Sequence, residues 1–202
     1  MGSESPYFKK SEAFQHPTGD DQEEGKLYYD ASTLGMTGPL RISYAREQAE
    51  THRYWHDTLN ALGVETNAAH IGGSNVGVWT NMGTVDRKSQ TRSYSHSAYY
   101  LPNAQRGNLV ILTDALVQEI VFNKNEIGEW TAHGVRFSHG GADHVVNVAR
   151  EIILAAGSIQ SPQLLELSGI GNMSILKAAG IDVKVDNPNV GEHLQDHLRK
   201  SV

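Results

Sequence analysis

The chain has 202 residues, of which 39% are hydrophobic and 20% charged, with a formal net charge of −6 and no cysteine. A chain of this length can bury a real core, which excludes global disorder, and the lack of cysteine excludes disulfides, thiolate metal sites and cysteine nucleophiles. The acidic balance, without a block of Lys or Arg, makes nucleic acid an unexpected partner. No apolar run approaches the length of a membrane span, and residues 1–10 lack the apolar segment of a secretory signal, so we expect no membrane partner and leave the localisation open.

The first half of the chain is predicted to hold one long helix among loops. Residues Ser11–Asp30 are polar and acidic with interspersed Gly and Pro, which predicts a solvated loop. Apolar residues then recur at spacings of three and four, which predicts an amphipathic helix over Ser43–Leu62, with Ser43 as N-cap and Gly63 as its stop. Its expected core face holds Ala49, Trp55, Leu59 and Leu62, and its polar face Arg46, Glu47, Glu50 and Arg53. The segment Arg87–Tyr100 allows a short helix in an ambiguous register.

The middle of the chain has the texture of short strands. Tight-turn residues separate four β signals within about 40 residues, which predicts an antiparallel meander inserted between helical regions. The four predicted strands are Leu109–Leu112, Leu116–Phe122, Thr131–Phe137 and His144–Val148, with turns at Asn123–Glu129 and Ser138–Gly141.

The last third returns to an α/β pattern. Ile152–Leu154 reads as a central strand buried on both faces, so truncating Leu154 to Ala should cost about 2 to 5 kcal/mol. Ser161 and Pro162 are placed as N-cap and first residue of a helix that Gly169 would end. A second helix over Ser174–Ala179 and an exposed edge strand over Ile181–Val185 are predicted to follow.

Small residues follow the predicted central strand at Ala155, Ala156 and Gly157. Open α/β folds bind ligands at the carboxyl ends of their strands, and missing side chains let a cofactor touch the backbone. Close packing of a helix against the strand explains the same small residues equally well.

The segment Gly157–Gly171, GSIQSPQLLELSGIG, resembles the second signature of the glucose-methanol-choline (GMC) family of FAD-dependent oxidoreductases. Three further segments resemble family motifs: Pro6–Glu12 (PYFKKSE), Asn108–Val117 (the NL.VLT…V strand) and Asn189–His197 (the GVGENLQDH turn). Nearly the whole chain is covered, and fungal aryl-alcohol and sorbose-type members are the most similar.

This resemblance implies an α/β fold with an α+β insert, part of an FAD-binding Rossmann-like domain with an antiparallel β meander. It implies FAD as cofactor and a small-molecule alcohol as substrate, which is oxidised at its CH–OH group by hydride transfer to the flavin, with oxygen or a quinone as acceptor. By position, Val117 would contact the adenine portion through its main chain, and Ala156 and Gly157 would lie beside the same cofactor. Taken alone, Val117 is also an ordinary β-branched strand residue.

The sequence departs from the family pattern in its missing parts. The strand, Gly-x-Gly-x-x-Gly turn and helix that hold the pyrophosphate are not found, and Gly72–Gly77 is predicted to be a loop near the substrate side instead. The family's first signature, its C-terminal substrate domain and its catalytic His are also missing. We therefore expect residues 1–202 to be a partial FAD-binding region without the first βαβ unit, inactive alone and with no assignable catalytic residue.

Two readings from other classes stay open beside the oxidoreductase. The chain could be a non-catalytic fragment or interaction module. A zinc protein built on His193 and His197 is weaker, because Glu192 precedes the first His instead of following it, so no metal is expected. His133, His139 and His144 straddle a predicted hairpin, where surface imidazoles explain them most simply.

Overall fold

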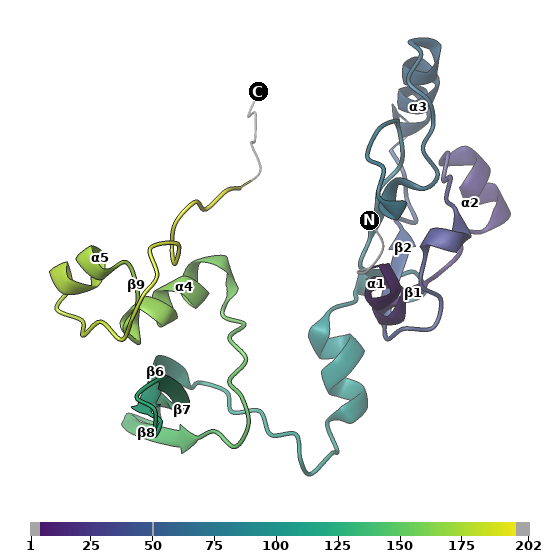
Figure 1. Cartoon of the computed structure of the whole chain (residues 1–202). Helices are drawn as coiled ribbons and strands as arrows, with labels where there is room; N and C mark the ends of the chain where they lie inside the picture. Colours follow the sequence, from purple (N-terminus) through teal and green to yellow (C-terminus); the bar gives the residue numbers. More distant parts are fainter. Residues whose placement is uncertain (1–4, 50, 197–202) are drawn as a thin grey trace. The chain divides into compact units, whose positions relative to one another are not determined.

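The computed structural model describes residues 5–49 and 51–196, and the chain divides into two compact units, Met1–Val110 and Ile111–Val202 (Figure 1). Both units contain helices and strands, which confirms the predicted mixed fold class. No helix among the described residues is long and apolar enough to cross a membrane.

The first unit combines short strands with short helices. Strand β1 (Glu12–Phe14) pairs in parallel with β2 (Leu40–Tyr44), β2 pairs antiparallel with β3 (Met82–Gly83), and β4 (Val85–Asp86) pairs antiparallel with β5 (Thr91–Arg92). The α-helices are α1 (Ser5–Ser11), α2 (Gly19–Glu24) and α3 (Thr51–Ala61). Four shorter helical turns are η1 (Ala31–Thr33), η2 (His70–Gly72), the π-helical turn η3 (His96–Tyr100) and η4 (Leu101–Asn103).

The core of this unit forms around the parallel strand pair. It consists of Phe14, Leu27, Leu34, Ile42 and Tyr44. The Tyr44 hydroxyl donates to the Tyr28 carbonyl at 2.9 Å, so this fully buried phenol keeps a hydrogen-bond partner. Burial also raises the pKa of Tyr44 to about 12.

The predicted helix over Ser43–Leu62 is wrong in its first half. Ser43 belongs to β2, and α3 begins at Thr51 and ends at Ala61, followed by Gly63 at a φ of +86°. Trp55 is 61% exposed, and the buried residue of α3 is His56. Ser43 and Tyr44 are the end of a strand whose partner, β1, lies far away in the sequence, and residues 45–49 belong to no helix or strand. Ala49 and Leu62 are exposed and Leu59 is half-buried, and Glu50 lies outside the described residues.

Two other expectations for this unit need correction. The predicted loop Ser11–Asp30 contains β1 and α2, and its Leu27 is 1% exposed, because nonlocal pairing and packing override its polar composition. The segment Arg87–Tyr100 holds β5 and η3 in place of one short helix.

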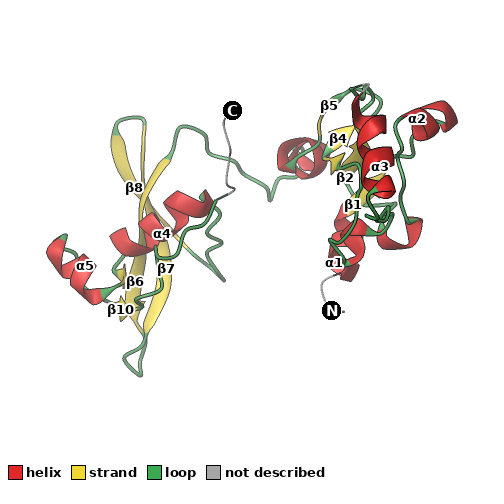
Figure 2. Cartoon of the chain, turned by 90° about the horizontal axis from the view of Figure 1, so that it is seen from above, coloured by secondary structure: helices red, strands yellow, loops and turns green. Residues whose placement is uncertain are grey.

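The second unit contains the antiparallel meander, here with three strands. They are β6 (Leu116–Lys124), β7 (Trp130–His139) and β8 (Ala142–Asn147), in that order in the sheet (Figure 2). Gly140 and Gly141, at φ values of +60° and +81°, turn β7 into β8, which confirms the predicted turn. The other elements are α4 (Gly157–Leu167), β9 (Ile170–Gly171), α5 (Met173–Ala178) and β10 (Val185–Asp186). Helix α5 agrees with prediction within one residue. The predicted edge strand Ile181–Val185 is wrong except at Val185, which begins β10, and β10 pairs in parallel with β9.

Two predicted strands are not formed. Leu109–Leu112 and Ile152–Leu154 belong to no strand, and Ile153 is 81% exposed where burial on both faces was expected. A strand of this type needs neighbours on both sides, and no strand among the described residues pairs with either segment. The expected cost of truncating Leu154, argued from a central strand, loses its basis.

Helix α4 begins earlier than predicted. It starts at Gly157, so Pro162 lies inside the helix and Ser161 is not its N-cap. The Ser161 hydroxyl instead accepts a hydrogen bond from the Ala156 N–H at 3.0 Å, satisfying a backbone donor just before the helix. Gly169, at a φ of +89°, follows the helix end as predicted.

Candidate functional site

The three residues predicted to bind the cofactor all lie in the second unit. Val117 is in β6, next to an irregularity in its pairing with β7, and it is 40% exposed. Ala156 and Gly157 are exposed at the start of α4. All three residues are therefore exposed to solvent.

Gly157 has the geometry expected of a backbone that a ligand approaches. Its φ of +89° is a conformation that favours glycine, and a Cβ built there would meet no atom within 4 Å. The space above this backbone is open.

Ser168 connects the two elements that carry these residues. Its hydroxyl accepts a hydrogen bond from the Ile120 N–H in β6 at 2.8 Å and donates to the Leu164 carbonyl in α4 at 2.6 Å. Ser168 is fully buried and Leu164 nearly so. The C-terminal end of α4 is thus tied to strand β6, against which the helix packs (Figure 2).

A groove of about 660 Å³ between α3 and residues 77–81 of the first unit was missed at the sequence level. It is lined in part by Trp55, His56 and Trp79. His56 is 2% exposed, with Nε2 3.1 Å from the Thr80 hydroxyl, while its buried Nδ1 has no hydrogen-bond partner. Burial lowers the pKa of His56, so its imidazole is neutral at pH 7. The sequence gives no indication that a His residue in a predicted helix, such as His56, will be buried.

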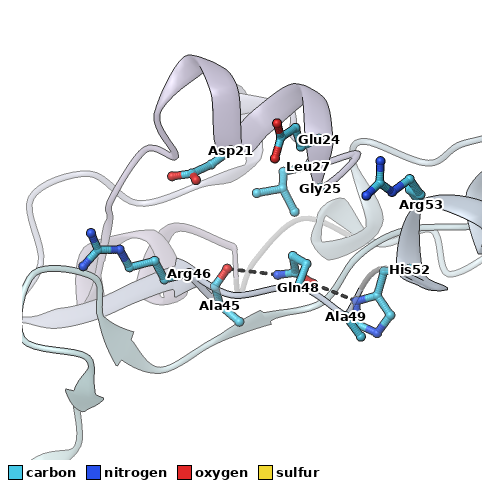
Figure 3. A pocket seen from close by; sticks show the side chains of 10 residues that line it. All are labelled: Asp21, Glu24, Gly25, Leu27, Ala45, Arg46, Gln48, Ala49, His52 and Arg53. Carbon is cyan, nitrogen blue, oxygen red and sulfur yellow. Dashed lines mark hydrogen bonds between the residues drawn. The ribbon is translucent and has the colours of Figure 1, made fainter.

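A smaller hollow of about 100 Å³ lies between α2 and the segment that precedes α3 (Figure 3). Asp21, Glu24, Arg46 and Arg53 bring both signs of charge to its lining, and Gln48 donates to the Ala45 carbonyl. The hollow is far smaller than a typical site for an organic ligand.

The remaining sequence candidates are distributed over both units. Gly72–Gly77 forms the end of η2 and a loop, as predicted. The His139 and His144 rings lie 6.4 Å apart, and His139 Nδ1 is 3.3 Å from the Asp114 carbonyl oxygen. Over residues 5–49 and 51–196, no three His, Asp or Glu residues cluster as metal ligands, and His197 lies outside these ranges.

Comparison with known proteins gives consistent matches over the whole chain. The family model described as GMC oxidoreductase matches residues 5–199. The chain is 34% identical over 192 residues to the GMC oxidoreductase family protein Mala s 12 of Malassezia sympodialis, covering 94% of this chain and 31% of that protein. It is 38% identical over 201 residues to the dehydrogenase citC of Monascus ruber, covering 98% and 31%.

Two solved structures share the fold. An FAD-dependent oxidoreductase from Chaetomium thermophilum is 32% identical with a TM-score of 0.83, covering 91% of this chain and 31% of that one. A fungal aryl-alcohol oxidase is 29% identical with a TM-score of 0.82, covering 93% and 31%. The chain thus spans about 31% of the length of these relatives. The match of the family model over residues 5–199 shows that the chain belongs to the GMC oxidoreductase family.

Proposed function

We propose that the chain forms part of an FAD-dependent oxidoreductase that oxidises the CH–OH group of a small-molecule alcohol. Its family membership supports this proposal, as do relatives named dehydrogenase, FAD-dependent oxidoreductase and aryl-alcohol oxidase. The flavin, when bound, supplies the hydride acceptor.

The contribution of these residues is to hold the adenosine end of the cofactor. The main chain of Val117 would read the adenine edge, since backbone N–H and C=O groups can pair with a base without side chains. Ala156 and Gly157 would let the cofactor approach the start of α4. The observation that carries this assignment is the open space above the Gly157 backbone.

Among the described residues, we assign none to the pyrophosphate and flavin portions of the cofactor. The glycines of 72–77 lie in a short turn and loop, without the strand–turn–helix arrangement that holds a pyrophosphate. We therefore expect the 202-residue chain to be colourless after incubation with excess FAD and desalting, and to oxidise no alcohol. Flavin absorbance near one equivalent, together with turnover of an alcohol, would contradict the assignment as a partial site.

Adenosine binding tests the proposed role of Gly157 directly. Calorimetric titration of the chain with ADP should give weak saturable binding, whereas FMN, which lacks adenosine, should not bind. Gly157→Ala should weaken ADP binding by about tenfold, since a Cβ at positive φ shifts this backbone.

Gly128→Ala is the matched control for this substitution. Gly128 has a φ of +85° and equally open surroundings, but it lies in the β6–β7 turn. It should leave ADP binding unchanged. If ADP does not bind, or if Gly157→Ala and Gly128→Ala weaken ADP binding equally, the result favours a non-catalytic fragment or interaction module.

A further inference from the structure

A second groove in the first unit, of about 590 Å³, is lined by two arginines from different strands. Arg41 lies in β2 and Arg92 in β5, and both are exposed. The lining also includes Asp86, Ser97 and Tyr99. This Arg41–Arg92 groove is separate from the residues assigned to the cofactor.

Buried backbone hydrogen bonds bring the two arginines to one place. Ser93, directly after β5, is 5% exposed, and its N–H donates to the Thr84 carbonyl at 2.8 Å. The Arg41 N–H donates to the Ser93 hydroxyl at 2.9 Å. The backbone of Arg41 is therefore hydrogen-bonded to the residue next to Arg92, and both arginines line the groove.

The hydrogen-bonding groups left unused in the groove are mostly donors. Among the described residues, neither Arg guanidinium nor the Tyr99 hydroxyl donates a hydrogen bond to the protein. The Ser97 hydroxyl is already used, because it accepts from the Tyr94 N–H and donates to the Tyr94 carbonyl. Each guanidinium carries five N–H donors and no acceptor, so the groove suits a group made of acceptors.

The one acid in the lining does not cancel this preference. The Asp86 carboxylate accepts hydrogen bonds from the N–H groups of Lys88 and Ser89, at 2.8 and 3.2 Å. The Ser89 N–H is the first cause that holds the pKa of Asp86 below its ordinary value, and the Arg41 charge adds to it. The lining of the groove thus holds one acidic residue and two arginines, an excess of positive charge in a chain whose net charge is −6.

We propose that the Arg41–Arg92 groove binds an oxyanion, the phosphate or carboxylate group of a small molecule. Planar guanidinium groups recognise both oxyanions through paired, charge-assisted hydrogen bonds. The Tyr99 hydroxyl supplies a further donor from η3, a π-helical turn of the kind found frequently at functional sites. This site stands independently of the oxidoreductase assignment.

The test is calorimetric titration of the full chain with inorganic phosphate and, separately, with acetate, at low ionic strength. Saturable binding of at least one anion is expected, and the tighter of the two identifies the source of the oxyanion. Arg92→Gln and Arg41→Gln should each weaken binding by about tenfold or more, because each removes a charged donor.

Arg150→Gln provides the matched control, since it removes the same charge from an exposed position of the second unit. It should leave the affinity within about twofold of the unmodified chain, because Arg150 does not line the groove and exposed charges are screened by salt. If neither anion saturates, or if Arg150→Gln weakens binding as much as Arg92→Gln, the proposal is wrong.

NMR titration of the unmodified chain with phosphate tests the site without relying on variants that could fail to fold. Phosphate should shift the backbone amide resonances of Arg92, Ser97 and Tyr99 more than those of the second unit. Shifts spread evenly over the chain would overturn the groove as the binding site.

Discussion

Ser168 fixes the packing of the second unit through one buried hydroxyl. Because it accepts from the Ile120 N–H and donates to the Leu164 carbonyl, Ser168→Ala leaves a buried backbone donor without a partner. Such a group costs about 1 to 3 kcal/mol, so urea unfolding followed by circular dichroism should show a loss of that size. Ser174→Ala, at an exposed helical position, should stay within about 0.5 kcal/mol of the unmodified chain. If Ser168→Ala lowers the free energy of unfolding as little as Ser174→Ala does, the connecting role of the Ser168 hydroxyl is contradicted.

His56 should make the first unit sensitive to acid. Its folded pKa lies below the ordinary 6.5, with burial as the first cause, so below about pH 6.5 the unfolded chain binds more protons than the folded one. Stability is therefore present above that pH and is lost as the pH falls through the folded pKa. Tryptophan fluorescence during urea unfolding at pH 7.5 and 5.5 measures this loss.

The control for this pH dependence is a pair of substitutions. His56→Gln should reduce the difference in unfolding midpoint between the two pH values, leaving the contribution of His70, whose pKa burial also lowers. His133→Gln, at an exposed strand position, should leave the difference unchanged. Equal behaviour of the two variants would refute the role of His56.

At the scale of elements, two glycines end the two helices of the second unit in different surroundings. Gly169 follows α4 at a φ of +89°, and a Cβ there would lie 2.5 Å from the Asp182 carbonyl oxygen. Gly180 follows α5 at a φ of +73°, with no atom within 4 Å. Gly180→Ala should cost about 1 to 2 kcal/mol from backbone strain alone, and Gly169→Ala more, because the Asp182 backbone must also move. The midpoints of thermal unfolding measure the stability lost in each variant. An equal loss in Gly169→Ala and Gly180→Ala would show that contact with Asp182 does not affect stability.

The elements that sequence predicted well are those closed by local turns. The meander and α5 depend on neighbouring residues, such as Gly140 and Gly141 between β7 and β8, and their signals lie within each segment. Strand β2 depends on β1, which is far away in the sequence, and its last two residues, Ser43 and Tyr44, fall within the predicted helix. Local periodicity cannot show such nonlocal pairing.

For the candidate site, the sequence indicated the small residues Ala156 and Gly157, whose contact with the cofactor stays a prediction. The structure gives Gly157 a positive φ and open surroundings, which Gly128 shares. The Arg41–Arg92 groove was not predictable, because Arg41 and Arg92 meet through Ser93 and not through any sequence spacing. Burial of His56 likewise depends on packing against Tyr28, whose ring lies 5.9 Å away.

At the scale of the whole molecule, four consecutive aliphatic side chains are exposed. Leu109, Val110, Ile111 and Leu112 are 39%, 85%, 55% and 51% exposed. No strand among the described residues pairs with this segment, so its backbone is a template for pairing with another chain. Contiguous exposed apolar surface adds to this tendency.

We therefore predict that the purified chain self-associates through residues 109–112. Val110→Lys should increase the monomer fraction in sedimentation velocity at a given concentration, since a charge in an exposed apolar strand opposes pairing. Val76→Lys is the matched control, because Val76 is also 85% exposed but lies in a glycine-flanked loop without apolar neighbours in sequence. It introduces the same charge, so it separates the effect of this segment from that of a lower net negative charge. A chain that is monomeric without substitution, or one whose association falls equally in both variants, would show that residues 109–112 do not drive association.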